Sequence, residues 1–156
     1  YYDINWHQLE KSKIIIFSPG PGNPSHYPET QTVYKKYKGN KKIIGICLGF
    51  QQILYAENAK IVPQKKIYHG YQSKVKALKV SALFKPNKVF LTGRYHSLKL
   101  KEPFNSSSLK ISMRCVESNV AMAIEDTINN VYGFQFHPDS FLTVDGKFLI
   151  QKVLQF

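Results

Sequence analysis

Cys47 lies in a segment whose pattern is typical of a reactive thiol. Residues 42–46 (KIIGI) predict a buried strand, and a helix is expected to begin near Leu48. Gly45 and Gly49 flank the cysteine, as in a sharp strand-to-helix turn that leaves no room for side chains. The start of the helix directs free N–H groups and a positive dipole end toward the sulfur, which favours the thiolate. A buried core cysteine is the alternative, but the two glycines favour a nucleophile.

His137 is a second candidate group, within the stretch 133–140. The Phe-x-Phe alternation before it predicts a half-buried strand that ends at the histidine. Asp139 follows two residues later, and Pro138 stiffens the link, so the carboxylate can orient the imidazole. The pattern is that of a general base for a thiol. A histidine that only satisfies a hydrogen bond at a strand end fits it equally well.

Two further loops carry residues suited to a site. In the stretch 18–24 (SPGPGNP), glycines allow the backbone to approach a ligand and to direct N–H groups at an oxyanion, although a plain tight turn also explains it. The stretch 94–98 (RYHSL) holds His96, a second candidate base for which a role in a substrate loop or interface is preferred. A nucleophile, a base with its carboxylate and oxyanion donors together indicate acyl transfer through a thioester.

The elements that position these residues follow from the hydrophobic pattern. The first third of the chain alternates strands at 14–17 and 42–46 with helices at 27–37 and 48–57, which is typical of a parallel α/β unit. Later strands, partly antiparallel, are predicted at 73–80, 88–91, 109–115, 120–124 and 131–136. We expect residues 1–13 at the surface and a final helix over 146–156. The sequence holds no repeat and no linker, so one domain is expected over 1–156.

Composition narrows the class of protein. A chain of 156 residues that is 43% hydrophobic can bury a core, so it is not a disordered chain. No apolar run approaches the length of a membrane span, and no signal peptide is recognised. Cys47 and Cys115 are too few for a disulfide framework, so a cytoplasmic location is expected. No pattern predicts a metal ion or a cofactor.

The formal charge of +12 invites a comparison with nucleic-acid-binding proteins. The basic residues are mostly lysines spread along the whole chain, and only Arg94 and Arg114 are arginines. A solvated lysine-rich surface, or a face for an acidic partner, explains this distribution better. We therefore expect neither a nucleic acid nor a membrane as partner, and a nucleic-acid-binding module is a remote alternative.

Five stretches match one family in order along the chain. They are Ser18–Pro24, Gly45–Gln51, His69-Gly70, Arg94–Leu98 and Gly133–Ser140. At these residues the chain resembles a class I glutamine amidotransferase, most closely the glutaminase subunits of anthranilate synthase and aminodeoxychorismate synthase. The resemblance implies an α/β fold with an open, mostly parallel central sheet, flanking helices and a small antiparallel sheet.

The resemblance also implies roles for individual residues. Cys47 would attack the side-chain amide of L-glutamine, His137 would act as base and acid, and Asp139 would orient the histidine. The backbone N–H groups of Gly20 and Leu48 would form the oxyanion hole. Positions that match the family's substrate-binding residues are Gly20, Pro21, Gly22, Gln51, Ser97 and Leu98. Ammonia would pass to a chorismate-binding synthase subunit, with no cofactor.

The chain departs from the family pattern in four places. Asp139 replaces a glutamate, so reduced rather than absent activity is expected. Phe50 replaces the usual histidine beside the nucleophile, and residues 71–73 lack a common lysine. The family's opening strand has no counterpart, so the first strand is expected to be missing and the domain N-terminally incomplete.

Two alternatives to an active ammonia-supplying subunit stay open. One is a catalytically weak or inactive homologue that binds the partner, as Asp139, Phe50 and the missing strand suggest. The other is a stand-alone hydrolase of γ-glutamyl compounds. The sequence also leaves open which aminated chorismate product results.

Overall fold

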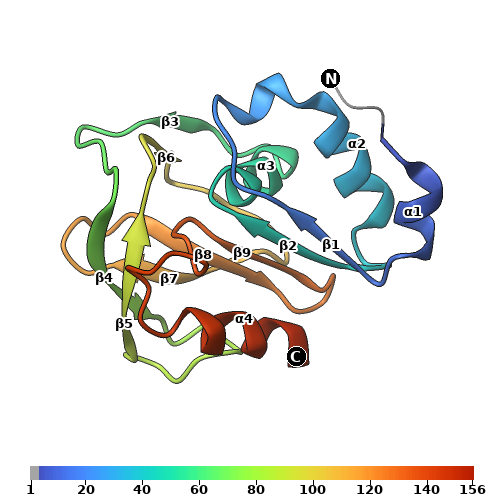
Figure 1. Cartoon of the computed structure of the whole chain (residues 1–156). Coiled ribbons are helices and arrows are strands. Elements are labelled where there is room, and N and C mark those ends of the chain that lie inside the picture. Colours follow the sequence, from blue (N-terminus) through green and yellow to red (C-terminus); the bar gives the residue numbers. More distant parts are fainter. Residues whose placement is uncertain (1–3) are drawn as a thin grey trace.

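A computed structural model describes residues 4–156 (Figure 1). The helices are α1 (Trp6–Lys11), α2 (Pro28–Tyr37), α3 (Leu48–Ala56) and α4 (Gly146–Gln155), with a 3₁₀ turn at Pro24–His26. The strands are β1 (Ile14–Phe17), β2 (Lys42–Ile46), β3 (Ile61–Pro63), β4 (Tyr71–Ala77), β5 (Val89–Arg94), β6 (Leu98–Leu100), β7 (Lys110–Cys115), β8 (Ala121–Asp126) and β9 (Val131–Phe134).

The strands within residues 4–156 form a large sheet in the order β1-β2-β9-β8-β7-β4-β5 and a small one that pairs β3 with β6. The pairs β1–β2 and β2–β9 are parallel, whereas the four remaining pairs of the large sheet are antiparallel. The predicted α/β class and small antiparallel sheet are confirmed. The parallel pairing is concentrated in β1, β2 and β9, the strands that lead to the cysteine and the histidine.

The core has two layers because the large sheet is covered on both faces. Figure 1 shows α2 and α3 on one face and α4 on the other. Successive residues of β2 alternate between these layers, with Ile43 packed in the α2–α3 layer and Ile44 in the layer of α4. Both are almost fully buried, and each contributes about 2 kcal/mol of hydrophobic stabilisation. The strand that leads to Cys47 is therefore fixed from both sides.

Lys42, the first residue of β2, ties this strand to the C-terminal helix. Its Nζ donates hydrogen bonds to the carbonyl oxygens of Val153 and Leu154, at 2.7 and 3.1 Å. These carbonyls belong to the last turn of α4, which has no further helical turn to satisfy them. Burial lowers the pKa of the Lys42 ammonium.

Several elements differ from the sequence predictions. Helix α1 was not predicted because it buries no residue and shows no apolar period; the expected surface location of this segment is confirmed from residue 4 onward. Residues 1–3 lie outside the described part of the chain. Strands β3 and β6, of three residues each, are too short to give a pattern. β4 begins two residues before the predicted strand, and β5 extends to Arg94.

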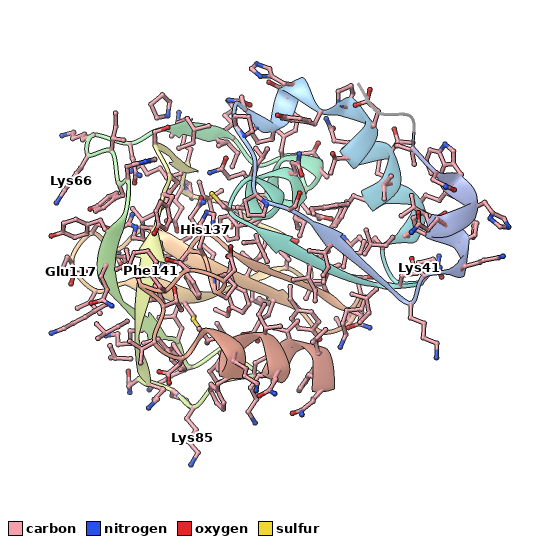
Figure 2. All side chains as sticks on the ribbon, in the orientation of Figure 1. Lys41, Lys66, Lys85, Glu117, His137 and Phe141 are labelled. Atoms are coloured by element: carbon pink, nitrogen blue, oxygen red, sulfur yellow. The ribbon has the colours of Figure 1, made fainter. Side chains whose placement is uncertain are left out.

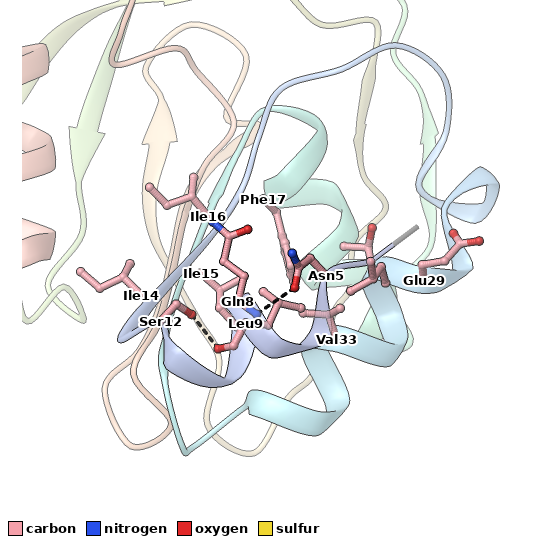
Figure 3. A pocket seen from close by; sticks show the side chains of 12 residues that line it. Asn5, Gln8, Leu9, Ser12, Ile14, Ile15, Ile16, Phe17, Glu29 and Val33 are labelled. Atoms are coloured by element: carbon pink, nitrogen blue, oxygen red, sulfur yellow. Dashed lines mark hydrogen bonds between the residues drawn. The ribbon is translucent and has the colours of Figure 1, made fainter. Parts of the chain in front are cut away.

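A cavity of about 440 Å³ lies along β1, between α1 and α2 (Figure 3). Ile14 and Ile16 border it and are 37% and 57% exposed. Among residues 4–156, those that line it include neither a cysteine nor a histidine. This cavity is therefore unsuited to the chemistry that the sequence predicts.

Candidate active site

Cys47 forms a strained corner between β2 and α3. Its φ of 54° is in the left-handed region, which costs a non-glycine residue free energy. A Cβ at Gly45 would lie 2.5 Å from the carbonyl oxygen of Gly49, and a Cβ at Gly49 would lie 2.0 Å from that of Phe17. The predicted strand-to-helix corner and its need for both glycines are confirmed.

One pocket of about 160 Å³ collects most of the predicted site residues. It is formed by the loop after β1, the start of α3 and the loop between β5 and β6. Its lining residues are Gly20, Pro21, Gly22, Cys47, Leu48, Gln51, Tyr95, His96, Ser97 and Leu98. All six residues proposed to bind substrate and both proposed oxyanion donors thus surround the same space as the thiol.

The environment of Cys47 favours the protonated thiol. Burial raises its pKa to about 11, and the negative charge of Asp139 adds a smaller increase. The backbone N–H of Leu48 opposes these effects because it donates to the sulfur. At neutral pH the sulfur therefore needs a proton acceptor before it can attack an amide.

His137 follows β9 at the same end of the sheet as Cys47 follows β2. The two strands are parallel neighbours, and the Cys47 N–H donates to the carbonyl oxygen of Phe134 at 2.8 Å. His137 is not among the residues that line the pocket. The ring of Tyr95, which does line it, contacts the imidazole with 5.0 Å between centroids. His137 is labelled in Figure 2.

Asp139 lies beside His137, but the contact is long and solvated. Its Oδ1 is 3.4 Å from the Nδ1 of His137, and its side chain is 66% exposed, compared with 15% for the histidine. Solvent screens such a pair strongly. The structure therefore brings the orienting carboxylate of Asp139 and the base His137 together, but the pair is not buried.

His96 has both ring nitrogens engaged within the protein. Arg94 Nε donates to His96 Nε2 at 3.0 Å, so Nδ1 must carry the proton and donate to the Leu98 carbonyl at 2.8 Å. Burial, together with the positive charge of Arg94, lowers the pKa of His96 to about 4. His96 is thus suited to shaping the substrate loop, the preferred interpretation, and not to accepting a proton.

Gln135 is a site residue that the sequence analysis missed. Phe134, Gln135 and Phe136 are all buried, so the prediction of a half-buried strand is wrong here. The Nε2 of Gln135 lies 3.9 Å from the Cys47 sulfur, and its Oε1 accepts from Gln51 Nε2 at 3.0 Å. A polar residue between two core aromatics was the signal that could have identified it.

Other kinds of site are not found in the part of the chain that the structure describes. Within residues 4–156, His, Cys, Asp and Glu side chains form no group of three that could hold a metal ion. Over the same range, no helix combines the length and the apolar character needed to cross a membrane.

The sequence of this chain matches a known protein family over almost its whole length. The model of the family "Glutamine amidotransferase class-I" matches residues 2–155. Anthranilate synthase component 2 of Lactococcus lactis is 37% identical over 144 residues, or 91% of this chain and 72% of the relative. That of Pyropia yezoensis is 38% identical over 152 residues, or 96% and 78%.

The chain belongs to the class I glutamine amidotransferase family.

The fold of this amidotransferase also matches a solved structure. A Thermoplasma acidophilum protein assigned to GMP synthase aligns with a TM-score of 0.80 at 20% identity, over 98% of this chain and 76% of the other. At that identity the likeness concerns the fold alone. The family recognised from the sequence stretches is confirmed, and with it an amidotransferase as the class of enzyme.

Proposed function

We propose that this chain is the glutaminase component of an anthranilate synthase. The observation that carries the proposal is that three segments far apart in sequence surround one pocket that contains a thiol. They contribute residues 20–22, then 47, 48 and 51, and then 95–98. The choice of pathway is supported by relatives named anthranilate synthase component 2. One domain, over residues 1–156, holds the site.

In the first half-reaction, the Cys47 sulfur attacks the carbonyl carbon of the glutamine side-chain amide. His137 accepts the thiol proton, and the oxyanion is stabilised by the N–H groups of Leu48 and Gly20. His137 then returns the proton to the amide nitrogen, the C–N bond breaks, and ammonia leaves. The glutamine is held meanwhile by Pro21, Gly22, Gln51, Ser97 and Leu98.

In the second half-reaction, water attacks the γ-glutamyl thioester on Cys47. His137 removes a proton from the water, the C–S bond breaks, and the thiolate takes the proton back. The products are glutamate and the free enzyme. The net reaction is glutamine plus water to glutamate plus ammonia, so no cofactor is required.

Ammonia passes to a chorismate-binding synthase subunit in this proposal. The loop after His137 carries Phe141 and Val144, whose side chains are 90% and 69% exposed, and Figure 2 labels the phenylalanine. Exposed apolar side chains beside a site are typical of a protein contact. The lysine-rich surface suits an acidic partner, and two free cysteines suit the cytoplasm.

The test is to measure glutamate and ammonia released from glutamine by the isolated protein and by its complex with the synthase subunit. We expect hydrolysis that increases with the partner, and anthranilate when chorismate is present. A covalent adduct on Cys47 should be trapped after rapid acid quenching and located by mass spectrometry.

Each alternative predicts a different result. No ammonia under either condition and no adduct on Cys47 would favour an inactive partner-binding homologue. Strong hydrolysis that the synthase does not change would favour a stand-alone γ-glutamyl hydrolase. Aminodeoxychorismate in place of anthranilate would assign the protein to the other chorismate pathway.

A further inference from the structure

We propose that Thr143 and Tyr95, more than Asp139, hold the candidate base His137 in position. This inference rests on the proposed function, because it concerns how the base is oriented. Asp139 is the residue that the sequence pattern selects for this task. Three sets of contacts around His137 lead to a different assignment.

The first set fixes the backbone of His137. Its N–H donates to the carbonyl oxygen of Gly93 at 3.0 Å, and its carbonyl accepts from Thr143 Oγ1 at 2.5 Å. The same Thr143 oxygen accepts from the Gly93 N–H at 2.9 Å. Thr143 is buried, so solvent does not compete for these bonds. One hydroxyl therefore ties the base to the end of β5.

The second set fixes the imidazole ring. Tyr95 meets it edge to face, with ring centroids 5.0 Å apart and an angle of 69° between planes. The Tyr95 hydroxyl lies 3.0 Å from Ser140 Oγ, and His69 contacts the tyrosine ring at 5.9 Å. Tyr95 also lines the pocket, so its ring packs against the imidazole at the edge of the substrate space and limits the rotation of His137.

The third set is the weak contact with Asp139. Its carboxylate is 66% exposed and 3.4 Å from Nδ1. Removing a solvated pair of this kind changes an equilibrium only modestly. By contrast, the Thr143 hydroxyl makes two hydrogen bonds, one with the Gly93 N–H and one with the His137 carbonyl. A small displacement of a catalytic base lowers the reaction rate steeply. Asp139 is closer to His137 in sequence, but Thr143 holds the histidine more firmly.

The test compares Thr143→Val, Thr143→Ser and Asp139→Asn in the complex with the synthase subunit. We expect Thr143→Val to lower kcat by about thirtyfold with little change in KM, because Thr143 does not line the pocket. Thr143→Ser keeps the hydroxyl and should restore kcat to within about threefold of wild type. Asp139→Asn should lower kcat by only about threefold.

A matched control is Thr92→Val, the same substitution at a buried threonine of β5 whose hydroxyl reaches Ser73. It should stay within about twofold of wild type, since its hydrogen bond is long. A large loss for Asp139→Asn with a wild-type rate for Thr143→Val would overturn the proposal. So would equal losses in Thr143→Val and Thr92→Val, because these would indicate a general effect on folding.

An NMR measurement separates this proposal from the proposed function. The nuclear Overhauser contacts between the His137 ring protons and neighbouring residues, which do not depend on the lost ring current, should change in Tyr95→Leu and stay nearly the same in Asp139→Asn. If wild-type protein does not hydrolyse glutamine, the proposed function fails, and the NMR comparison still decides which side chains hold His137. Equal changes in these contacts in both variants would contradict the assignment to Tyr95.

Discussion

The two halves of the candidate site are fixed by different means. At Cys47, backbone packs against backbone: α3 lies so close to β1 and β2 that Gly45 and Gly49 admit no side chain. At His137, side chains from other segments, Thr143 and Tyr95, provide the contacts. The nucleophile is therefore expected to tolerate almost no change around it, whereas the base should respond to substitution in graded steps.

The strongest test of the cysteine half is Cys47→Ser. It should lower glutamine hydrolysis by at least about three orders of magnitude, because the nucleophile is lost. Synthesis of anthranilate from added ammonia should persist in the complex with the synthase subunit. Cys115→Ser is the control, since this cysteine is buried in β7, the strand predicted at 109–115, and does not line the pocket. Undiminished hydrolysis by Cys47→Ser would show that the assignment is wrong.

Gly49→Ala tests whether backbone packing fixes the corner. The new Cβ would meet the Phe17 carbonyl at 2.0 Å, so we expect a loss of more than about 3 kcal/mol in the free energy of unfolding. Gly20→Ala is the matched control and should lose less stability, because its Cβ would meet only the flexible end of the Leu48 side chain at 3.0 Å. Denaturant unfolding should rank the two variants in this order, and similar stabilities would contradict the packing argument.

The pH dependence of alkylation examines the cysteine without substrate. Burial raises the pKa of Cys47 to about 11, and the thiolate is the reactive form, so reactivity must rise as pH rises. The rate with iodoacetamide should increase about tenfold per pH unit from 7 to 9. Labelling of Cys47→Ser gives the contribution of Cys115. A plateau below pH 9 would show that the folded protein stabilises the thiolate.

A smaller effect than these is expected at His96, which shapes the pocket from the loop after β5. His96→Leu removes the hydrogen bond to the Leu98 carbonyl and should raise the KM for glutamine about fivefold. His96→Asn can supply an N–H on a shorter side chain and should give a smaller increase. Steady-state kinetics with varied glutamine would measure both, and a fall in kcat alone would point instead to a role for His96 in proton transfer.

The same contrast explains what the sequence could predict. The corner at Cys47 was predicted because its determinants, a buried strand, two glycines and a helix, are adjacent in the chain. Thr143 was missed because its role depends on Gly93, fifty residues away. Gln135 was missed because its burial depends on α3 packing over β9, which no local period reveals. The antiparallel strands were anticipated only in part, since pairing across the sheet is a long-range property.

The hydrogen bonds of Lys42 couple the local unfolding of α4 to that of β2. The ammonium that binds the last turn of α4 belongs to the first residue of β2, the strand that leads to Cys47. If the helix end detached alone, it would leave a buried cation without acceptors, which is costly. Amide hydrogen exchange at the end of α4 should therefore be as slow as that of β2, so that the end of α4 and the reactive corner open as one cooperative unit.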